Sequence, residues 1–202
     1  VTAGYMHDQA RREFYAKMDA ANVDLKAFTD DFYFKLTGAH LQPVLDTLRY
    51  LKHETHVWFE ITTLLIPGKN DSDEEITAMC LWIKKELGVD VPLHFSAFHP
   101  DYKMSDIPPT PPATLIRARN IAINAGLQYV YTGNVHNLEG DTTFCPNCHT
   151  PLIVRDWYQI KQYRLTEDGC CPNCATSISG CFAEKAGNFG RKRIPIAITP
   201  YA

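Results

Sequence analysis

Long apolar runs and an excess of charge of either sign are absent from this sequence of 202 residues. No stretch reaches the roughly 18 apolar residues that a membrane-spanning helix needs, so we expect no membrane partner. Lys and Arg number 20 against 23 Asp and Glu, a net charge of −3, which does not favour binding to nucleic-acid phosphates. The opening residues lack the charged and apolar regions of a signal peptide, and we therefore expect a cytoplasmic protein without nucleic-acid partners.

Cysteine is scarce in the first part of the chain, where Cys80 stands alone. The other six cysteines lie between positions 145 and 181, in a stretch rich in Gly, Asn and short polar segments. A small module of this composition is held together by something other than a large core. We predict a main domain over residues 1–138, a cysteine module over 139–190 and a solvated tail over 191–202, which includes Arg191-Lys192-Arg193.

In the main domain, short apolar runs alternate with helical patterns, which is typical of βα repeats and a parallel sheet. We expect strands at 21–25, 56–65, 92–97 and 128–132, and helices at 43–52, 73–87 and 111–125. Polar side chains follow each strand, where the carboxyl ends of parallel strands form the ligand face. We therefore predict an α/β fold, a partial (β/α) TIM-like barrel followed by a zinc-ribbon-like module. An open four-stranded sheet is the alternative.

Several residues at these strand ends are candidates for binding. Asp24 and Lys26 are two apart, so they share one face of a strand and are suited to an amino-acid zwitterion; a simple salt bridge is the alternative. Glu60 lies within an apolar strand, where burial is costly unless the charge is paired, or unless the strand is at an edge and Glu60 faces water. His99 is either a ligand contact or a loop histidine.

A set of motifs in the main domain resembles the later barrel repeats of radical S-adenosylmethionine enzymes. The motifs are Thr2-Ala3-Gly4-Tyr5, Val23-Asp24-Leu25-Lys26, Leu65-Ile66-Pro67-Gly68-Lys69-Asn70-Asp71, Phe95-Ser96-Ala97-Phe98-His99-Pro100-Asp101-Tyr102 and Tyr129-Val130-Tyr131-Thr132-Gly133-Asn134. The sequence most resembles the radical enzyme of the AmmeMemoRadiSam system, which is similar to pyruvate formate-lyase activating enzyme. The resemblance implies that Thr2, Asp24 and Lys26 help to bind S-adenosylmethionine and a nearby cation, with His99 near its adenosyl part.

The sequence departs from this family in one respect. Radical S-adenosylmethionine enzymes hold a [4Fe–4S] cluster by three cysteines, usually spaced C-x3-C-x2-C, and no such triplet is present. We interpret the chain as the C-terminal portion of such an enzyme, either a piece of a longer protein or a shortened homologue. An incomplete barrel exposes strand edges, so the expected partners are the missing N-terminal barrel segment or a second copy, together with a protein substrate.

The cysteine module contains the tetrapeptide Cys-Pro-Asn-Cys twice, with 22 residues between the copies. Two such turns supply the four thiolates of a tetrahedral structural zinc site, here Cys145, Cys148, Cys171 and Cys174. The intervening segments 152–158 and 160–165 are expected to form a hairpin. Rubredoxin-type iron uses the same ligands, and His149 fits the site only with distortion.

Two further cysteines of the module, Cys170 and Cys181, are expected to be free buried thiols. A second iron–sulfur cluster from these two and Cys174 is the alternative.

Two classes of function follow from this sequence. The first is an enzyme that, in complete form, cleaves S-adenosylmethionine reductively to place a radical on a substrate or partner protein. The second is a noncatalytic, zinc-binding interaction module on a truncated barrel scaffold. Without cluster cysteines, this chain alone is expected to be inactive.

Overall fold

The computed structural model of the protein describes residues 1–187. The predicted tail over 191–202 and the last three residues of the cysteine module lie outside the described residues. Within the described part, no helix is both long enough and apolar enough to pass through a membrane.

The main domain is built on a parallel sheet of four strands, which confirms the predicted α/β class. The strands are β1 (Ala20–Asp24), β2 (Trp58–Leu65), β3 (Leu93–Ala97) and β4 (Val130–Gly133), and they pair in that order. Sequential order of neighbouring strands is the arrangement of a barrel wall. Among residues 1–187, however, β1 and β4 are the two edges of an open sheet, so a closed barrel is not formed by this part of the chain.

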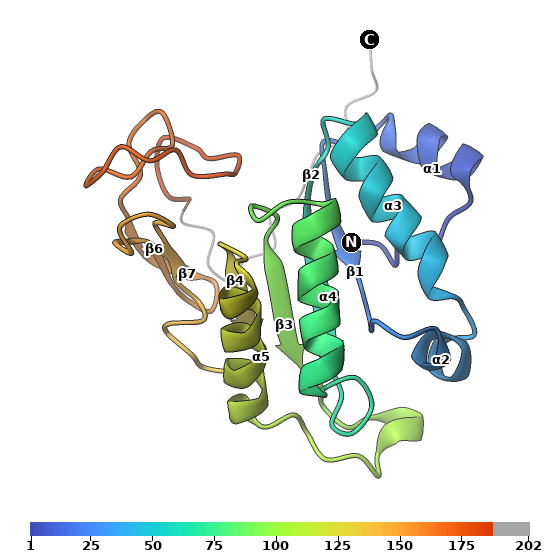
Figure 1. Ribbon diagram of the computed structural model, residues 1–202. Coiled ribbons are helices and arrows are strands. Elements are labelled where there is room, and N and C mark those ends of the chain that lie inside the picture. The colour runs from blue at the N-terminus through green and yellow to red at the C-terminus, as the bar shows by residue number, and fades with distance from the viewer. Residues whose placement is uncertain (188–202) are drawn as a thin grey trace.

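Three helices, α3 (Leu41–Glu54), α4 (Asp73–Glu86) and α5 (Pro112–Ala125), lie over one face of this sheet (Figure 1). All three predicted helices are confirmed, because their apolar stripes supply the buried contacts with the sheet. The Ser72 side chain accepts from the Glu75 amide at the start of α4. Gly126 ends α5 at a φ of 106°, a left-handed conformation that favours glycine.

Other helical elements in the main domain were not predicted. They are α1 (Asp8–Tyr15), the short α2 (Asp30–Phe32), a π-helix over Tyr33–Thr37 and a 3-10 turn over Tyr102–Met104. Only two residues of α1, Arg11 and Tyr15, are buried, and most of its side chains are polar or charged. These elements depend on contacts made after folding, which a periodic pattern does not show.

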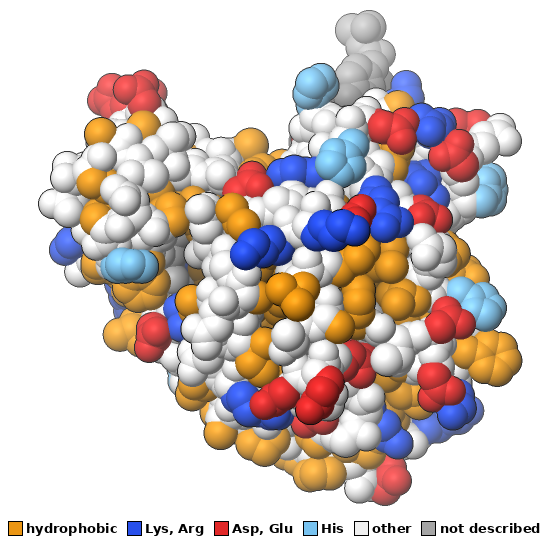
Figure 2. All heavy atoms as spheres, viewed as in Figure 1, with side chains coloured by type: hydrophobic (Ala, Val, Ile, Leu, Met, Phe, Trp, Pro, Cys, Tyr) orange, Lys and Arg blue, Asp and Glu red, His pale blue; other side chains and the backbone are white. Residues whose placement is uncertain are grey.

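The cysteine module contains a second, antiparallel sheet of β5 (Thr143–Phe144), β6 (Pro151–Asp156) and β7 (Gln159–Tyr163). Strands β6 and β7 form the expected hairpin through a two-residue turn, with Trp157 at a φ of 52°. Figure 1 shows this sheet beside β4, at the edge of the main sheet away from β1. In the space-filling view, the module forms a separate lobe, divided from the main domain by a notch (Figure 2).

Contacts between the two regions involve β4, the residue before it and helix α5. Tyr129 belongs to the small apolar cluster of the module and accepts from the Ser179 amide at 3.3 Å. The Tyr131 hydroxyl lies 2.8 Å from Thr143 Oγ1, and Arg119 forms an ion pair with Glu139. The edge of the main sheet is therefore also the base of the cysteine module.

Candidate metal centre and candidate cofactor-binding edge

Four cysteines of the module converge on one point, as the repeated tetrapeptide predicts. The sulfur atoms of Cys145, Cys148, Cys171 and Cys174 all lie within 4.8 Å of one another. The Sγ atoms of Cys145 and Cys174 are 3.5 Å apart, and those of Cys148 and Cys171 are 3.6 Å apart. Four sulfurs at about 2.3 Å from a tetrahedral zinc are about 3.8 Å from one another, so the spacing fits a metal ion.

The two cysteine turns have the same backbone construction. The His149 amide donates to the Cys145 carbonyl at 3.0 Å, and the Ala175 amide donates to the Cys171 carbonyl at 2.9 Å. His149 and Ala175 both have positive φ values, 58° and 56°. This left-handed residue after each second cysteine turns the chain back, so that both sulfurs of a turn point to the centre. His149 is exposed, which agrees with the expectation that it fits the metal site only with distortion.

Hydrogen bonds favour the thiolate form of two of these cysteines. Those from Asn173 and Thr150 lower the pKa of Cys148 to about 5, and the Thr176 hydroxyl and amide lower that of Cys174. Burial raises the pKa of Cys145 to about 11 in the absence of a metal ion. Thiolates are the form that binds metal, so the set is suited to a soft divalent cation.

Cys170 and Cys181 lie outside this set. Cys170 is half-buried and Cys181 is exposed, so the expectation that both thiols are buried is wrong. Within residues 1–187, the four-cysteine group is the one cluster of potential ligands with metal-site spacing. A second cluster that includes Cys174 would compete with the tetrahedral set for the same sulfur.

The candidate cofactor-binding residues at β1 lie close together. The Thr2 amide donates to the Asn22 carbonyl, and the Asp24 amide donates to the Thr2 carbonyl, both at 2.9 Å, so Thr2 extends the sheet beyond β1. Lys26 Nζ lies 2.9 Å from Asp24 Oδ2. Both side chains are partly exposed, so one ammonium and one carboxylate stand together at the carboxyl end of β1.

Buried groups fix the backbone at Lys26. Asn70 donates to the Lys26 carbonyl at 2.6 Å and to the Leu64 carbonyl at 2.9 Å, and it accepts from the Ile66 amide at 2.7 Å. The Lys26 amide donates to the Tyr33 hydroxyl at 3.0 Å, and burial raises the pKa of Tyr33 to about 12. Asn70, which belongs to one of the quoted motifs, therefore links the loops after β1 and β2.

The sheet face opposite the three helices is polar. The register aligns Asp24, Thr62, His94 and Tyr131 in one row across the four strands. These side chains are all partly exposed, whereas their neighbours along each strand are buried against the helices. We call this surface the open face. It presents one polar side chain from every strand, as a ligand-binding wall does.

Glu60 lies on the open face of an interior strand, which rules out the edge-strand alternative. Its Oε2 is 2.6 Å from His94 Nε2, and its Oε1 accepts from Trp58 Nε1 at 3.3 Å. Burial is the largest single influence and opposes ionisation, but His94, Trp58 and Arg155 together lower the pKa of Glu60. Sequence reasoning marked Glu60 as needing a partner but did not find His94, which lies 34 residues away.

His99 lies in the exposed loop after β3, two strands away from β1. It stands at the same end of the sheet as Asp24, but no contact joins the two residues within the described chain.

A [4Fe–4S] cluster does not fit the residues of the main domain. Its one cysteine, Cys80, is fully buried in α4, and burial raises the pKa of this thiol to about 12. A buried, protonated thiol on the helical side of the sheet is not a cluster ligand.

The described fold is therefore an α/β fold of sequential βα repeats with a four-cysteine module at its edge. No known protein-family model matches the sequence. An uncharacterised protein of Methanocaldococcus jannaschii is 42% identical over 179 residues, which are 88% of this chain and 53% of that protein. The chain thus spans about half the length of this relative.

Solved structures provide a second comparison. A domain of a pyruvate-formate lyase-activating enzyme from Bacteroides vulgatus matches with a TM-score of 0.57 at 15% identity, over 66% of this chain and 80% of that one. A radical SAM methyltransferase from Sphaerobacter thermophilus gives a TM-score of 0.45 at 17% identity, over 55% of this chain and 32% of that one. The first match shows a shared fold; the second is too low to support an argument. The match confirms the α/β fold with a parallel sheet that the motif resemblance implies, and the partial barrel stays a prediction.

Proposed function

We propose that this chain is the C-terminal portion of a radical S-adenosylmethionine enzyme of the AmmeMemoRadiSam group. In complete form, the enzyme would bind S-adenosylmethionine and cleave it reductively, placing a radical on a substrate or partner protein. The cluster ligands lie outside this chain in this proposal. The observation that supports it most is the Asp24–Lys26 charge pair at the carboxyl end of β1, in a sheet whose fold resembles the activating-enzyme domain.

The residues of this chain have a binding role in the proposal. Asp24 and Lys26 form a charge pair that complements the amino and carboxylate groups of a methionine zwitterion. Thr2 fixes the backbone beside this pair, and Asn70 holds Lys26 in place. His99 stays a predicted contact to the adenosyl part. The iron–sulfur cluster supplies the electron for cleavage when it is bound, and this chain contributes binding residues instead of cluster ligands.

Calorimetric titration of the chain with S-adenosylmethionine tests the binding role. We expect weak, saturable binding that falls about tenfold in Asp24→Asn and in Lys26→Met, since each variant removes one charged partner of the zwitterion. The chain offers a matched control in Asp31 and Lys35, an exposed ion pair of 2.8 Å. Asp31→Asn and Lys35→Met should leave the affinity unchanged. Absence of binding, or equal losses in both pairs, would contradict the proposal.

The four-cysteine site favours a second function, which is structural zinc binding. We propose that Cys145, Cys148, Cys171 and Cys174 hold one zinc ion, with rubredoxin-type iron as the alternative. Four protein sulfurs leave no open coordination position, so such an ion stabilises the module rather than activating water. Native mass spectrometry and the absorption spectrum distinguish the two metals, because a zinc protein is colourless and an iron–sulfur site is not.

If the chain holds zinc but does not bind S-adenosylmethionine, the noncatalytic interaction module becomes the better description.

A further inference from the structure

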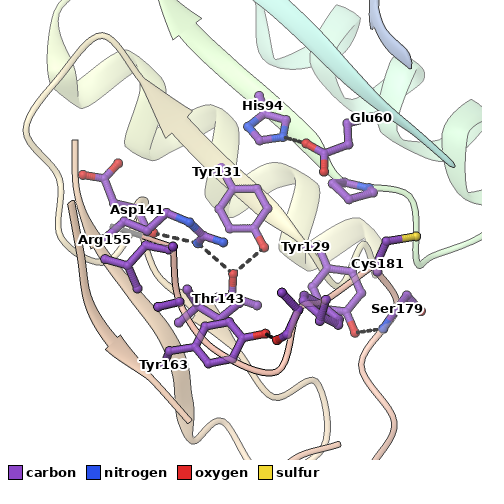
Figure 3. A pocket seen from close by; sticks show the side chains of 18 of the residues that line it. Glu60, His94, Tyr129, Tyr131, Asp141, Thr143, Arg155, Tyr163, Ser179 and Cys181 are labelled. Atoms are coloured by element: carbon purple, nitrogen blue, oxygen red, sulfur yellow. Dashed lines mark hydrogen bonds and ion pairs between the residues drawn. The ribbon is translucent and has the colours of Figure 1, made fainter. Parts of the chain in front are cut away.

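A cavity of about 490 Å³ lies between the open face and the cysteine module. Its walls come from β2, β3 and β4 on one side, and from β6, β7 and residues 179–187 on the other (Figure 3). This volume is in the range of pockets that bind small organic molecules. The lining does not include Thr2, Asp24, Lys26 or His99, so the cavity is separate from the edge proposed for S-adenosylmethionine.

Arg155 on β6 supplies a fixed positive charge to the cavity. Its Nη1 donates to Thr143 Oγ1 at 2.9 Å and to the Asp141 carbonyl at 3.2 Å. Its guanidinium carbon lies 5.7 Å from the centre of the Tyr131 ring. Within the described residues, Nε and Nη2 of Arg155 make no hydrogen bond. Two N–H groups of a positioned guanidinium are the geometry that binds a carboxylate.

Two acidic side chains line the cavity, Glu60 and Asp141. The Glu60 carboxylate is paired with His94 and Trp58, which also line the cavity. The Asp141 carboxylate points away from the labelled aromatic rings in Figure 3. Lys185 adds a second positive side chain to the lining. An anionic group of a ligand is therefore favoured next to Arg155.

Planar groups form much of the remaining surface of the cavity. The His94 and Tyr131 rings stack with their centres 5.0 Å apart at an interplanar angle of 25°. Trp58, Tyr129 and Tyr163 also line the cavity. The parts of these rings that face the cavity can contact another flat ring by offset stacking or edge to face.

The imidazole of His94, which is part of this aromatic wall, is held in a defined orientation. Because the Glu60 carboxylate accepts a hydrogen bond, His94 Nε2 is the protonated nitrogen of this pair. Nδ1 is then the ring nitrogen left to pair with a hydroxyl group of the ligand.

We propose that this cavity is a binding site for a small aromatic carboxylate, with Arg155 holding the acid group and the His94–Tyr131 wall holding the ring. The inference does not depend on the proposed radical chemistry. It follows from the Nε and Nη2 edge of Arg155, which is unpaired within residues 1–187, and from the aromatic side chains of both sheets around it.

The test uses the metal-loaded chain and two probes that differ only in charge, 4-hydroxybenzoate and 4-hydroxybenzamide. Amide chemical shifts are followed by NMR during each titration. We expect saturable shifts at the cavity residues for the carboxylate, with an affinity about tenfold higher than that for the amide. S-adenosylmethionine should not compete with the carboxylate, which separates this test from that of the proposed function.

Arg155→Gln should reduce the affinity for 4-hydroxybenzoate to that for 4-hydroxybenzamide, whereas Arg164→Gln, an exposed arginine of the same module, should have no effect. Arg155→Lys retains the charge and should retain a preference for the carboxylate. This variant shows whether the loss in Arg155→Gln comes from the missing charge or from a disturbed fold of the module. Equal affinity of the native chain for both probes, shifts confined to residues outside the cavity, or no saturable shift at millimolar probe would overturn the proposal.

Discussion

The main domain and the cysteine module differ in what stabilises them. The main domain buries one continuous apolar cluster drawn from β1 to β4 and α3 to α5. The buried cluster of the module consists of Tyr129, Cys145, Leu152, Ile153, Cys171 and Ile178, of which two are candidate metal ligands and one belongs to the main domain. Three aliphatic side chains are too few for an independent core. The difference implies that one region is stable without metal and the other is not.

Replacing one of the four metal-binding cysteines should have the largest effect on stability. The effect should be confined to the cysteine module. We expect Cys171→Ser to abolish metal binding and to unfold residues 143–178, because structural zinc contributes on the order of 10 kcal/mol to such modules. Zinc per chain and NMR signal dispersion are the measurements. Cys170→Ser removes the adjacent sulfur, which lies outside the cluster, and should change neither. A folded, metal-free Cys171→Ser module would remove the contrast between the regions.

Truncating a buried side chain in the helical layer should destabilise the main domain alone. Ile83 of α4 is fully buried, whereas Leu81 of the same helix is half exposed. We expect Ile83→Ala to lower the free energy of unfolding by about 3 kcal/mol and Leu81→Ala by less than about 0.5 kcal/mol. Urea denaturation gives both values, and zinc content should stay the same. Loss of zinc in Ile83→Ala would show that the two regions fold as one unit.

Loss of the Asn70 side chain should have a smaller effect on the same region. The substitution Asn70→Ala leaves the Ile66 amide and the Lys26 and Leu64 carbonyls without their present partner. We expect a loss of about 2 kcal/mol, together with weaker S-adenosylmethionine binding, because Lys26 is no longer fixed. Asn120→Ala, at an exposed position on α5, is the control for denaturation and calorimetry. An unchanged affinity for S-adenosylmethionine would show that Asn70 does not support the cofactor-binding edge.

The Glu60–His94 pair should give the smallest effect, and one that depends on pH. The pKa of Glu60 is lowered below its ordinary value of 4.5 in the folded protein, so the pair stabilises the fold above that pH. This stability is lost as the pH falls through the folded pKa. Because the carboxylate is partly exposed, we expect less than about 1 kcal/mol.

The measurement is the difference in unfolding free energy between the native chain and Glu60→Gln, from pH 7 down to pH 3. A difference that grows toward low pH would have the wrong sign for this pair.

The sequence was most informative where a local pattern decides the structure. Helices α3, α4 and α5 follow from their apolar stripes and end signals, and the metal centre follows from a repeated tetrapeptide. The Glu60–His94 pair and the cavity beside Arg155 did not follow from the sequence, since they depend on which strands become neighbours. Helix α1 and the π-helix were missed because they bury few side chains.

The described residues form an open sheet, which fits both the predicted partial barrel and its alternative, an open four-stranded sheet. Four sequential strands form a wall with two edges, and the relative from Methanocaldococcus jannaschii is about twice as long as the aligned part. The expected partners, a missing barrel segment or a second copy, therefore stay predictions. Light scattering of the chain alone measures whether its edges associate.

Hydrogen exchange with and without S-adenosylmethionine is the strictest test of the binding role of Asp24 and Lys26, because it locates the ligand on the fold. We expect slower exchange of the amides at 22–26 and 66–71, with no change at 143–178. Slower exchange confined to the cysteine module, or none at any segment under conditions where calorimetry detects binding, would contradict it.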